Sequence, residues 1–163
     1  MGESPSVHAS AVLAGPRAVL IRGGAGMGKS RLALGLIAAA QCGLLRFARL
    51  VGDDRVHLEP HHGRLLVRPT PALAGLIEVR GVGIRRIEHE RFAMVGLVVD
   101  LAADDAERMP SSDQTVIHEI RLPRLGIAGD TDPLHPVIAA LSTLVGDIKP
   151  RTATLRSPSR GQK

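Results

Sequence analysis

Eight consecutive residues near the N-terminus combine glycine, lysine and serine in a spacing that suits a polyphosphate. They are Gly23, Gly24, Ala25, Gly26, Met27, Gly28, Lys29 and Ser30, and they match the pattern G-x-x-x-x-G-K-[ST] in full. Glycines let backbone N–H groups point at phosphate oxygens, because no Cβ stands in the way. Lys29 adds a mobile charge for the terminal phosphates, and the Ser30 hydroxyl can join a Mg²⁺ shell. The sequence therefore predicts binding of a nucleoside triphosphate with Mg²⁺.

Acidic residues further along the chain are candidates for the metal clamp and the base that phosphoryl transfer needs. Asp53 and Asp54 end an apolar run, and adjacent strand residues point to opposite faces, so the two need not share a role. An ordinary acidic turn would show the same letters. Glu78 lies in an apolar run close to Arg80, where a structural Glu–Arg pair is the alternative to a carboxylate that faces a metal.

The histidines and the single cysteine give no indication of a zinc site or a disulfide. His8 lies in an apolar segment, where a partly buried histidine without function is the common case. The histidines show no zinc-ligand spacing supported by cysteines, since Cys42 is the single cysteine. That lone thiol allows no intramolecular disulfide and fits a reducing cytoplasm. The sequence also lacks a G-x-S-x-G element, so a hydrolase of that type is not indicated.

Apolar runs and turn residues predict the elements that must position these groups. Two strands are expected on either side of Gly15-Pro16, followed by the glycine loop and by a helix over Lys29–Gln41 that Gly43 ends. That helix is apolar on most sides, so we expect it to be buried on most of its surface. The other predicted elements are strands at Phe47–Val51, Val56–Leu58, Arg64–Val67, Leu76–Val79, Phe92–Leu101 (central) and Thr115–Leu122 (outer), and a helix at Pro133–Val145 with Asp132 as its N-cap. The predicted fold class is α/β, a P-loop-containing mixed β-sheet with a buried helix after the phosphate loop and a C-terminal helix.

The composition of the chain argues against nucleic acid and membranes as binding partners. The net charge of +5 comes from residues 149–163, which hold five basic residues and no acidic one, so we expect one domain over 1–148 and a basic, disordered tail. With Phe47 and Phe92 as the only aromatic residues, single-stranded nucleic acid has few stacking platforms, and a nucleic-acid role would rest on the tail alone. No secretory signal and no apolar stretch of about 18 residues is present, so a soluble, cytoplasmic protein without a membrane partner is expected.

Taken together, the motifs resemble the catalytic domain of HPr kinase/phosphorylase, a bacterial family that phosphorylates a serine of the phosphocarrier protein HPr. The matching segments occur in the family's order, from Val7 to about Val145. They are Val7-His8-Ala9-Ser10, the loop Gly23–Ser30, Val51-Gly52-Asp53-Asp54-Arg55-Val56, Ile77-Glu78-Val79-Arg80-Gly81-Val82-Gly83-Ile84 and, more loosely, Ile120-Arg121-Leu122-Pro123-Arg124. The glycine loop alone is common, whereas its combination with the two acidic motifs is far more specific.

The resemblance implies a role for each matching position. Lys29 would bind the phosphates of ATP, and Ser30 and Glu78 would hold Mg²⁺. The Asp53/Asp54 pair would supply the base that accepts the serine proton, with either member open for that role. His8 would belong to the site beside the aspartates, and Arg80 would help to form it. An HPr-like phosphocarrier is the implied partner, and a homo-oligomer is implied too, hexameric in the long enzymes.

Some segments depart from the family's pattern. Long members carry a separate N-terminal domain, so the chain resembles the short form that has the catalytic domain only. Ile84–Arg91 stands where long members have a mobile loop with a further arginine, and Pro123–Ile127 replaces a glycine-rich segment linked to the reverse reaction. We therefore predict a kinase rather than a phosphorylase. A small-molecule P-loop kinase and a non-catalytic nucleotide-binding sensor or interaction module remain as alternatives.

Overall fold

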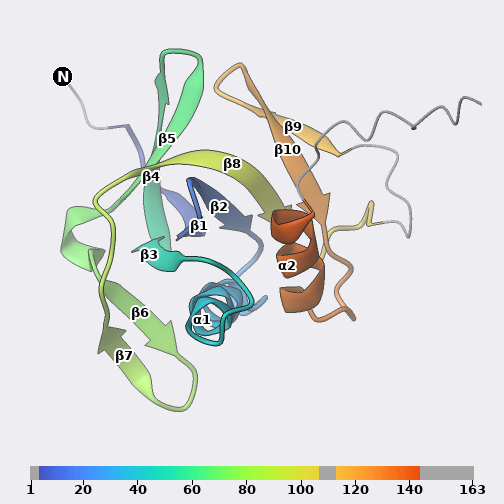
Figure 1. The fold of residues 1–163 in the computed structure, drawn as a ribbon. Coiled ribbons are helices and arrows are strands. Elements are labelled where there is room, and N and C mark those ends of the chain that lie inside the picture. Colours follow the sequence, from blue (N-terminus) through green and yellow to red (C-terminus); the bar gives the residue numbers. More distant parts are fainter. Residues whose placement is uncertain (1–3, 107–112, 144–163) are drawn as a thin grey trace, which may run out of the picture.

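The computed structural model describes residues 4–106 and 113–143 (Figure 1). The helices are α1 (Lys29–Gln41) and α2 (Leu134–Ser142), with a 3-10 turn, η1, at Pro71–Leu73. The strands are β1 (Val7–Ala14), β2 (Arg17–Arg22), β3 (Ala48–Gly52), β4 (Arg55–His61), β5 (Arg64–Pro69), β6 (Leu76–Val79), β7 (Gly83–Arg86), β8 (Ala93–Asp100), β9 (Gln114–Ile117) and β10 (Ile120–Gly126). The predicted tail at 149–163 lies outside the described residues. Within them, neither helix is long and apolar enough to span a membrane.

The main sheet is mixed, as the sequence predicts, and it curves back on itself (Figure 1). β1 pairs antiparallel with β2, β3 and β4, and β4 continues to β5. β8 runs parallel to β2 and β10 and antiparallel to β5. The pairings therefore close a circuit through β1, β4, β5, β8 and β2. β8 is apolar along its length because both of its faces are covered, with Val95 and Val98 in one apolar layer and Leu97 and Val99 in the other.

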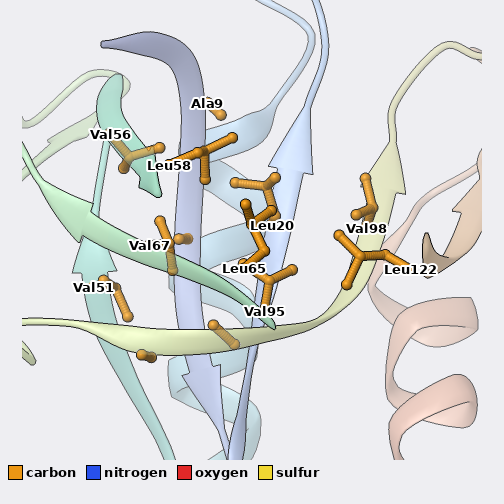
Figure 2. Packing of buried hydrophobic residues seen from close by; sticks show 13 residues of the cluster. Ala9, Leu20, Val51, Val56, Leu58, Leu65, Val67, Val95, Val98 and Leu122 are labelled. Atoms are coloured by element: carbon orange, nitrogen blue, oxygen red, sulfur yellow. The ribbon is translucent and has the colours of Figure 1, made fainter. Parts of the chain in front are cut away.

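Two apolar layers hold the fold, one on each face of the sheet. The first fills the curved sheet, where side chains of β1, β2, β4, β5 and β8 meet, including Leu20, Leu65 and Val98 (Figure 2). The second lies between the sheet and the helices, and Leu32 and Leu36 of α1 are its largest helical members. Figure 1 shows α1 under the sheet and α2 beside it. Both layers lack aromatic side chains and consist of Ala, Val, Leu and Ile.

Helix α1 buries one face fully, and most of its other residues are half-buried. Its fully covered residues are Lys29, Leu32, Ala33, Leu36 and Ala39. Arg31 and Ala38 are exposed, because α2 covers only part of the side of α1 that points away from the sheet. The helix ends as expected, with Gly43 in the left-handed region at φ 78° and its N–H donating to the carbonyl of Ala40.

The structure differs from the predicted strands at two hairpins, β9–β10 and β6–β7. Thr115–Leu122 is not one outer strand but two, β9 and β10, which turn at His118 and Glu119 with φ of 48° and 64°. A two-residue turn with both residues left-handed normally carries Asn-Gly, so His-Glu gave no turn signal. β7 was not predicted, and it pairs with β6 across Gly81, whose φ is 79°. Figure 1 shows this β6–β7 hairpin projecting from the sheet.

The second helix starts at Leu134, one residue later than predicted. Pro133 takes the cap position, and the Asp132 carboxylate accepts the Leu134 N–H at 3.1 Å. The helix ends at Ser142, three residues before the predicted end at Val145, which lies outside the described residues. Asp132 therefore lies one residue before the N-cap position that was predicted for it. Its carboxylate still accepts a hydrogen bond from one of the unpaired N–H groups of the first helical turn.

Gly52, the last residue of β3, directly precedes Asp53 and has no room for a side chain. A Cβ there would lie 2.7 Å from Val56 Cγ1 and 3.2 Å from Pro69 Cα. We expect Gly52→Ala to lower the free energy of unfolding by about 1–3 kcal/mol through overpacking, measured by urea denaturation. Gly129→Ala is the matched control, because its Cβ would meet Ala102 at an ordinary 3.7 Å. Equal free energies of unfolding for the two variants would contradict overpacking at Gly52.

Candidate active site

The glycine loop joins the end of β2 to the start of α1. Gly28 precedes the helix with φ 95°, a conformation that residues with a Cβ rarely adopt. Gly23 packs closely on the end of β8, since a Cβ would lie 3.1 Å from Leu101 Cβ. Buried β2, the loop and the N-terminus of α1 form the arrangement in which backbone N–H groups and the helix dipole favour an anion.

Lys29 is the one buried cation in the described residues, with 6% of its surface exposed. Its Nζ donates to the carbonyls of Gly23 at 2.8 Å and Gly24 at 2.9 Å, so the ammonium lies against the loop. Burial lowers the pKa of Lys29, and the negative charges of Asp54 and Asp53 offset part of that shift. The Lys29 side chain thus lies beside the loop with carboxylates nearby, where phosphate oxygens can replace the two carbonyls as its partners.

Asp53 follows β3 and is 3% exposed. Its carboxylate accepts the Ser10 hydroxyl at 2.6 Å and the Ser30 hydroxyl at 2.8 Å to each oxygen. The backbone N–H of Glu78 donates to Oδ2 at 3.2 Å. Three donors thus fix this carboxylate directly beside the serine of the glycine loop.

Asp54 turns the other way. It has φ 64°, its side chain is 64% exposed, and its Oδ1 lies 3.1 Å from Nε2 of His8. Asp53 and Asp54 form a bend between β3 and β4, which run in the same direction along one edge of β1, and the positive φ of Asp54 belongs to this bend. The structure therefore separates the two aspartates, one buried against the loop and one open to solvent beside a histidine.

Ser10 is a site residue that the sequence analysis missed. It is fully buried and two residues after His8 on β1, so both side chains lie on one face of the strand. That spacing was the available signal, because His8 was already a candidate. The apolar residues around Ser10 suggested a core position instead.

Glu78 and Arg80 are placed less closely than the other predicted residues. Glu78 meets Asp53 through its backbone, and its side chain is exposed. Arg80 is exposed in the turn after β6, and among the described residues no hydrogen bond or ion pair joins it to either aspartate. The Glu78–Arg80 ion pair considered as an alternative is likewise not formed in that part of the chain.

The side-chain oxygens of Ser30 and Asp53 are suitable ligands for a magnesium ion beside the loop. Mg²⁺ prefers oxygen ligands and keeps several waters, so it is usually bound by one or two carboxylates together with substrate phosphates. The Ser30 hydroxyl and the Asp53 carboxylate supply such oxygens at adjoining positions. Across residues 4–106 and 113–143, no three His, Cys, Asp or Glu side chains gather closely enough to hold a metal on their own. The site can therefore hold Mg²⁺ with phosphate oxygens as further ligands.

A second polar network, also missed from the sequence, ties together the strands that lead into the loop. Asp100, at the end of β8, accepts two hydrogen bonds from Arg22 at 2.7 and 2.8 Å and a third from Arg124 of β10. Burial alone would raise the pKa of Asp100, but the hydrogen bonds from Arg22 and Arg124 outweigh it and hold this pKa below its usual value. Arg22 directly precedes the glycine loop, so this network anchors the end of β2, where the loop begins, to β8 and β10.

The depressed pKa of Asp100 gives a pH-dependent stability. The carboxylate stabilises the folded state fully above the pKa of an unfolded aspartate, about 3.9, and this contribution is lost as the pH falls through the lower folded value. We expect Asp100→Asn to lower stability at pH 7 and to flatten the acid limb of the stability curve below about pH 4. Urea unfolding between pH 2 and 7 measures this, with the exposed Asp104→Asn as control. An unchanged acid limb would show that Asp100 is not the group responsible.

A glycine loop between a buried strand and a helix, with a lysine, a serine and a buried carboxylate converging on it, is the arrangement of a P-loop domain. The family described as HPr Serine kinase C-terminal domain matches residues 1–94, more than half of the sequence. The chain belongs to this family.

Several HPr kinase/phosphorylase proteins are similar to the chain. That of Mycoplasma mycoides subsp. mycoides is 34% identical over 103 residues, which are 59% of this chain and 31% of that protein. That of Limosilactobacillus reuteri is 32% identical over 121 residues, 74% of this chain and 34% of that protein. That of Streptococcus thermophilus is 41% identical over 85 residues, 52% of this chain and 25% of that protein. The chain thus spans about a third or less of the length of these relatives.

The fold also agrees with a solved structure. The Hpr(Ser) kinase/phosphatase from Coxiella burnetii superimposes with a TM-score of 0.69, covering 86% of this chain and 95% of that one at 24% identity. This likeness shows the fold. It covers much of the chain beyond residue 94, where the family match ends.

Proposed function

We propose that the chain is a Mg²⁺-dependent protein serine kinase that transfers the γ-phosphate of ATP to a serine of an HPr-like phosphocarrier protein in the cytoplasm. One observation carries the proposal. The loop serine, Ser30, and a buried carboxylate, Asp53, are in direct contact, while a second carboxylate, Asp54, stands exposed beside His8. Phosphoryl transfer needs one group near the metal and another at the incoming hydroxyl, and the separate positions of the two aspartates support this division of roles.

The proposed mechanism assigns a task to each group. Bound Mg²⁺ would neutralise charge on the terminal phosphates, held by Ser30 and Asp53. Lys29 and the loop N–H groups fix the phosphate chain. Asp54 accepts the proton of the substrate serine, whose oxygen forms a bond to the γ-phosphorus as the bond to the β–γ bridging oxygen breaks. His8 orients Asp54 through the 3.1 Å contact.

The proposal also includes Glu78 and Arg80 in the active site. The N–H of Glu78 helps to hold Asp53, which supports a position near the metal for the Glu78 carboxylate. Arg80 follows two residues later, on the projecting β6–β7 hairpin, from which its guanidinium can reach a bound phosphate or an acidic part of the carrier. The proposal concerns the kinase direction, because Pro123–Ile127 departs from the segment linked to the reverse reaction.

The test is phosphoryl transfer to a carrier. We expect purified protein, incubated with ATP labelled in its γ-phosphate, Mg²⁺ and HPr, to label HPr on one serine, located by mass spectrometry. Omission of Mg²⁺ should abolish the labelling. Nucleotide binding without transfer to any carrier would contradict the kinase and favour a nucleotide-binding interaction module. Labelling of a small molecule instead would favour a small-molecule kinase.

A further inference from the structure

Three charged side chains lie at the ends of the strands that lead to the glycine loop and flank it. β2, β8 and β10 run parallel, so their carboxyl ends lie at the same edge of the sheet. Arg22 ends β2, Asp100 ends β8, and Arg124 lies two residues before the end of β10. Ligands of α/β sheets bind outside the carboxyl ends of the strands, and the proposed mechanism uses none of these three residues.

Arg22 is held at both its side chain and its backbone. Its Nε and Nη2 donate to the two oxygens of Asp100 at 2.7 and 2.8 Å, a bidentate contact that fixes the orientation of the guanidinium as well as its distance. The carbonyl of Arg22 accepts the N–H of Leu101 at 2.9 Å. Two consecutive residues at the end of β8 therefore determine where the chain leaves β2.

The residue after Arg22 takes part directly in the phosphate site. Gly23 packs on Leu101, since a Cβ would lie 3.1 Å from Leu101 Cβ, and its carbonyl accepts Lys29 Nζ at 2.8 Å. A displacement of Arg22 would move this carbonyl, and with it the lysine and the first N–H groups of the loop. Binding groups need to be held within about 0.5 Å of their working positions by such supporting contacts.

Arg124 keeps the Asp100 carboxylate turned toward Arg22. Its Nε donates to Oδ2 of Asp100, and its two Nη atoms donate to Asp105 at 2.8 and 2.9 Å. The side chains of Arg124 and Asp100 are 14% and 17% exposed, so water competes little for this contact. Two guanidinium groups therefore hold Asp100 from different strands and leave its carboxylate little freedom to release Arg22.

We infer that Asp100 is a positioning residue for the phosphate loop and that it acts through Arg22. Asp100 contacts no ligand atom itself; it determines where the loop begins and, through Gly23, where Lys29 lies. This inference rests on the proposed function, because it needs a triphosphate that the loop binds.

Calorimetry of the full chain with Mg²⁺–ATP tests the inference. We expect Asp100→Asn to weaken binding about ten-fold, as when residues that orient the direct ligands of a site are removed. Mg²⁺–tripolyphosphate should bind more weakly by the same factor, because the loop holds the phosphates and not the nucleoside. Glu59→Gln is the matched control, since it takes a carboxylate from Arg68 on the β4–β5 hairpin and should leave both affinities unchanged.

A double-mutant cycle shows whether Asp100 acts through Arg22. Arg22→Gln should weaken the binding of Mg²⁺–ATP, and the double variant Arg22→Gln/Asp100→Asn should bind no more weakly than Arg22→Gln alone. Factors that multiply in the double variant would contradict the coupling. Arg22→Lys keeps the positive charge but loses the bidentate contact, so it should weaken binding too. Unchanged affinity in Arg22→Lys would contradict the inference even if Asp100→Asn failed to fold.

The sign of the Asp100→Asn effect separates positioning from electrostatics. Removal of a negative charge near the loop would by electrostatics alone tighten the binding of an anion. Tighter or unchanged ATP binding in Asp100→Asn, with or without a lower free energy of unfolding, would overturn the positioning role and leave the phosphate site intact. Binding of neither ligand to the unmodified chain would overturn the proposed function and this inference together.

Discussion

Lys29→Ala is expected to abolish phosphoryl transfer to the carrier, with a loss of at least about 100-fold in rate. The Lys29 ammonium lies on the carbonyls of Gly23 and Gly24, at the opening of the loop, and no other buried cation among the described residues can replace it. Because its burial disfavours the charged form, its loss should leave the fold intact. The measurement is the rate of HPr labelling from ATP, together with the urea unfolding curve.

A matched substitution makes this result interpretable. Arg46→Ala removes an exposed positive charge beyond the far end of α1 and should leave the transfer rate unchanged. If Lys29→Ala retained most of the transfer activity while folded, the role assigned to the lysine would be wrong. A loss of activity accompanied by unfolding would instead assign Lys29 a structural role.

The two aspartates should differ sharply when each is replaced by asparagine. Asp54→Asn removes the proposed base, so we expect the transfer rate to fall by about 10²–10⁴-fold while Mg²⁺–ATP affinity and stability stay unchanged. Asp53→Asn faces the Ser10 and Ser30 hydroxyls and the Glu78 N–H with an amide that has one acceptor oxygen. It should lower the free energy of unfolding by about 1–3 kcal/mol and weaken the dependence of binding on Mg²⁺.

Transfer rates, calorimetric affinities with and without Mg²⁺, and urea unfolding together distinguish the two variants. The observation behind the split is burial, since Asp53 is 3% exposed whereas the Asp54 side chain is 64% exposed. Should Asp53→Asn lose rate alone and Asp54→Asn lose metal dependence, the two assignments are reversed. Identical behaviour of the two variants would contradict any separation of roles.

The sequence indicates the centre of the site because the relevant signals are local. The loop Gly23–Ser30 carries its chemistry in eight consecutive residues, and the strand before it and the helix after it show clear apolar patterns. The long run at Phe92–Leu101 likewise indicates β8, which has partners on both edges. The mixed sheet with two helices follows from such runs.

Adjacent strand positions predict that Asp53 and Asp54 point to opposite faces, but which of the two is buried was outside the reach of the sequence. The burial of Asp53 depends on the bend between β3 and β4, where Asp54 has a positive φ, and on Ser10, which reaches Asp53 from 43 residues earlier. The same holds for Asp100, whose partners Arg22 and Arg124 lie on two different strands. Contacts between distant segments leave no periodic pattern, and the His118-Glu119 turn hides the β9–β10 hairpin because it lacks glycine and asparagine.

Titration of the unmodified chain with ATP, with Mg²⁺ present and then with Mg²⁺ removed by EDTA, tests the phosphate site most directly. The site built from the loop, Lys29, Ser30 and Asp53 predicts saturable binding of one ATP per chain that weakens at least about ten-fold without the metal. Absence of any heat of binding with Mg²⁺ present, or binding that ignores the metal, would contradict it.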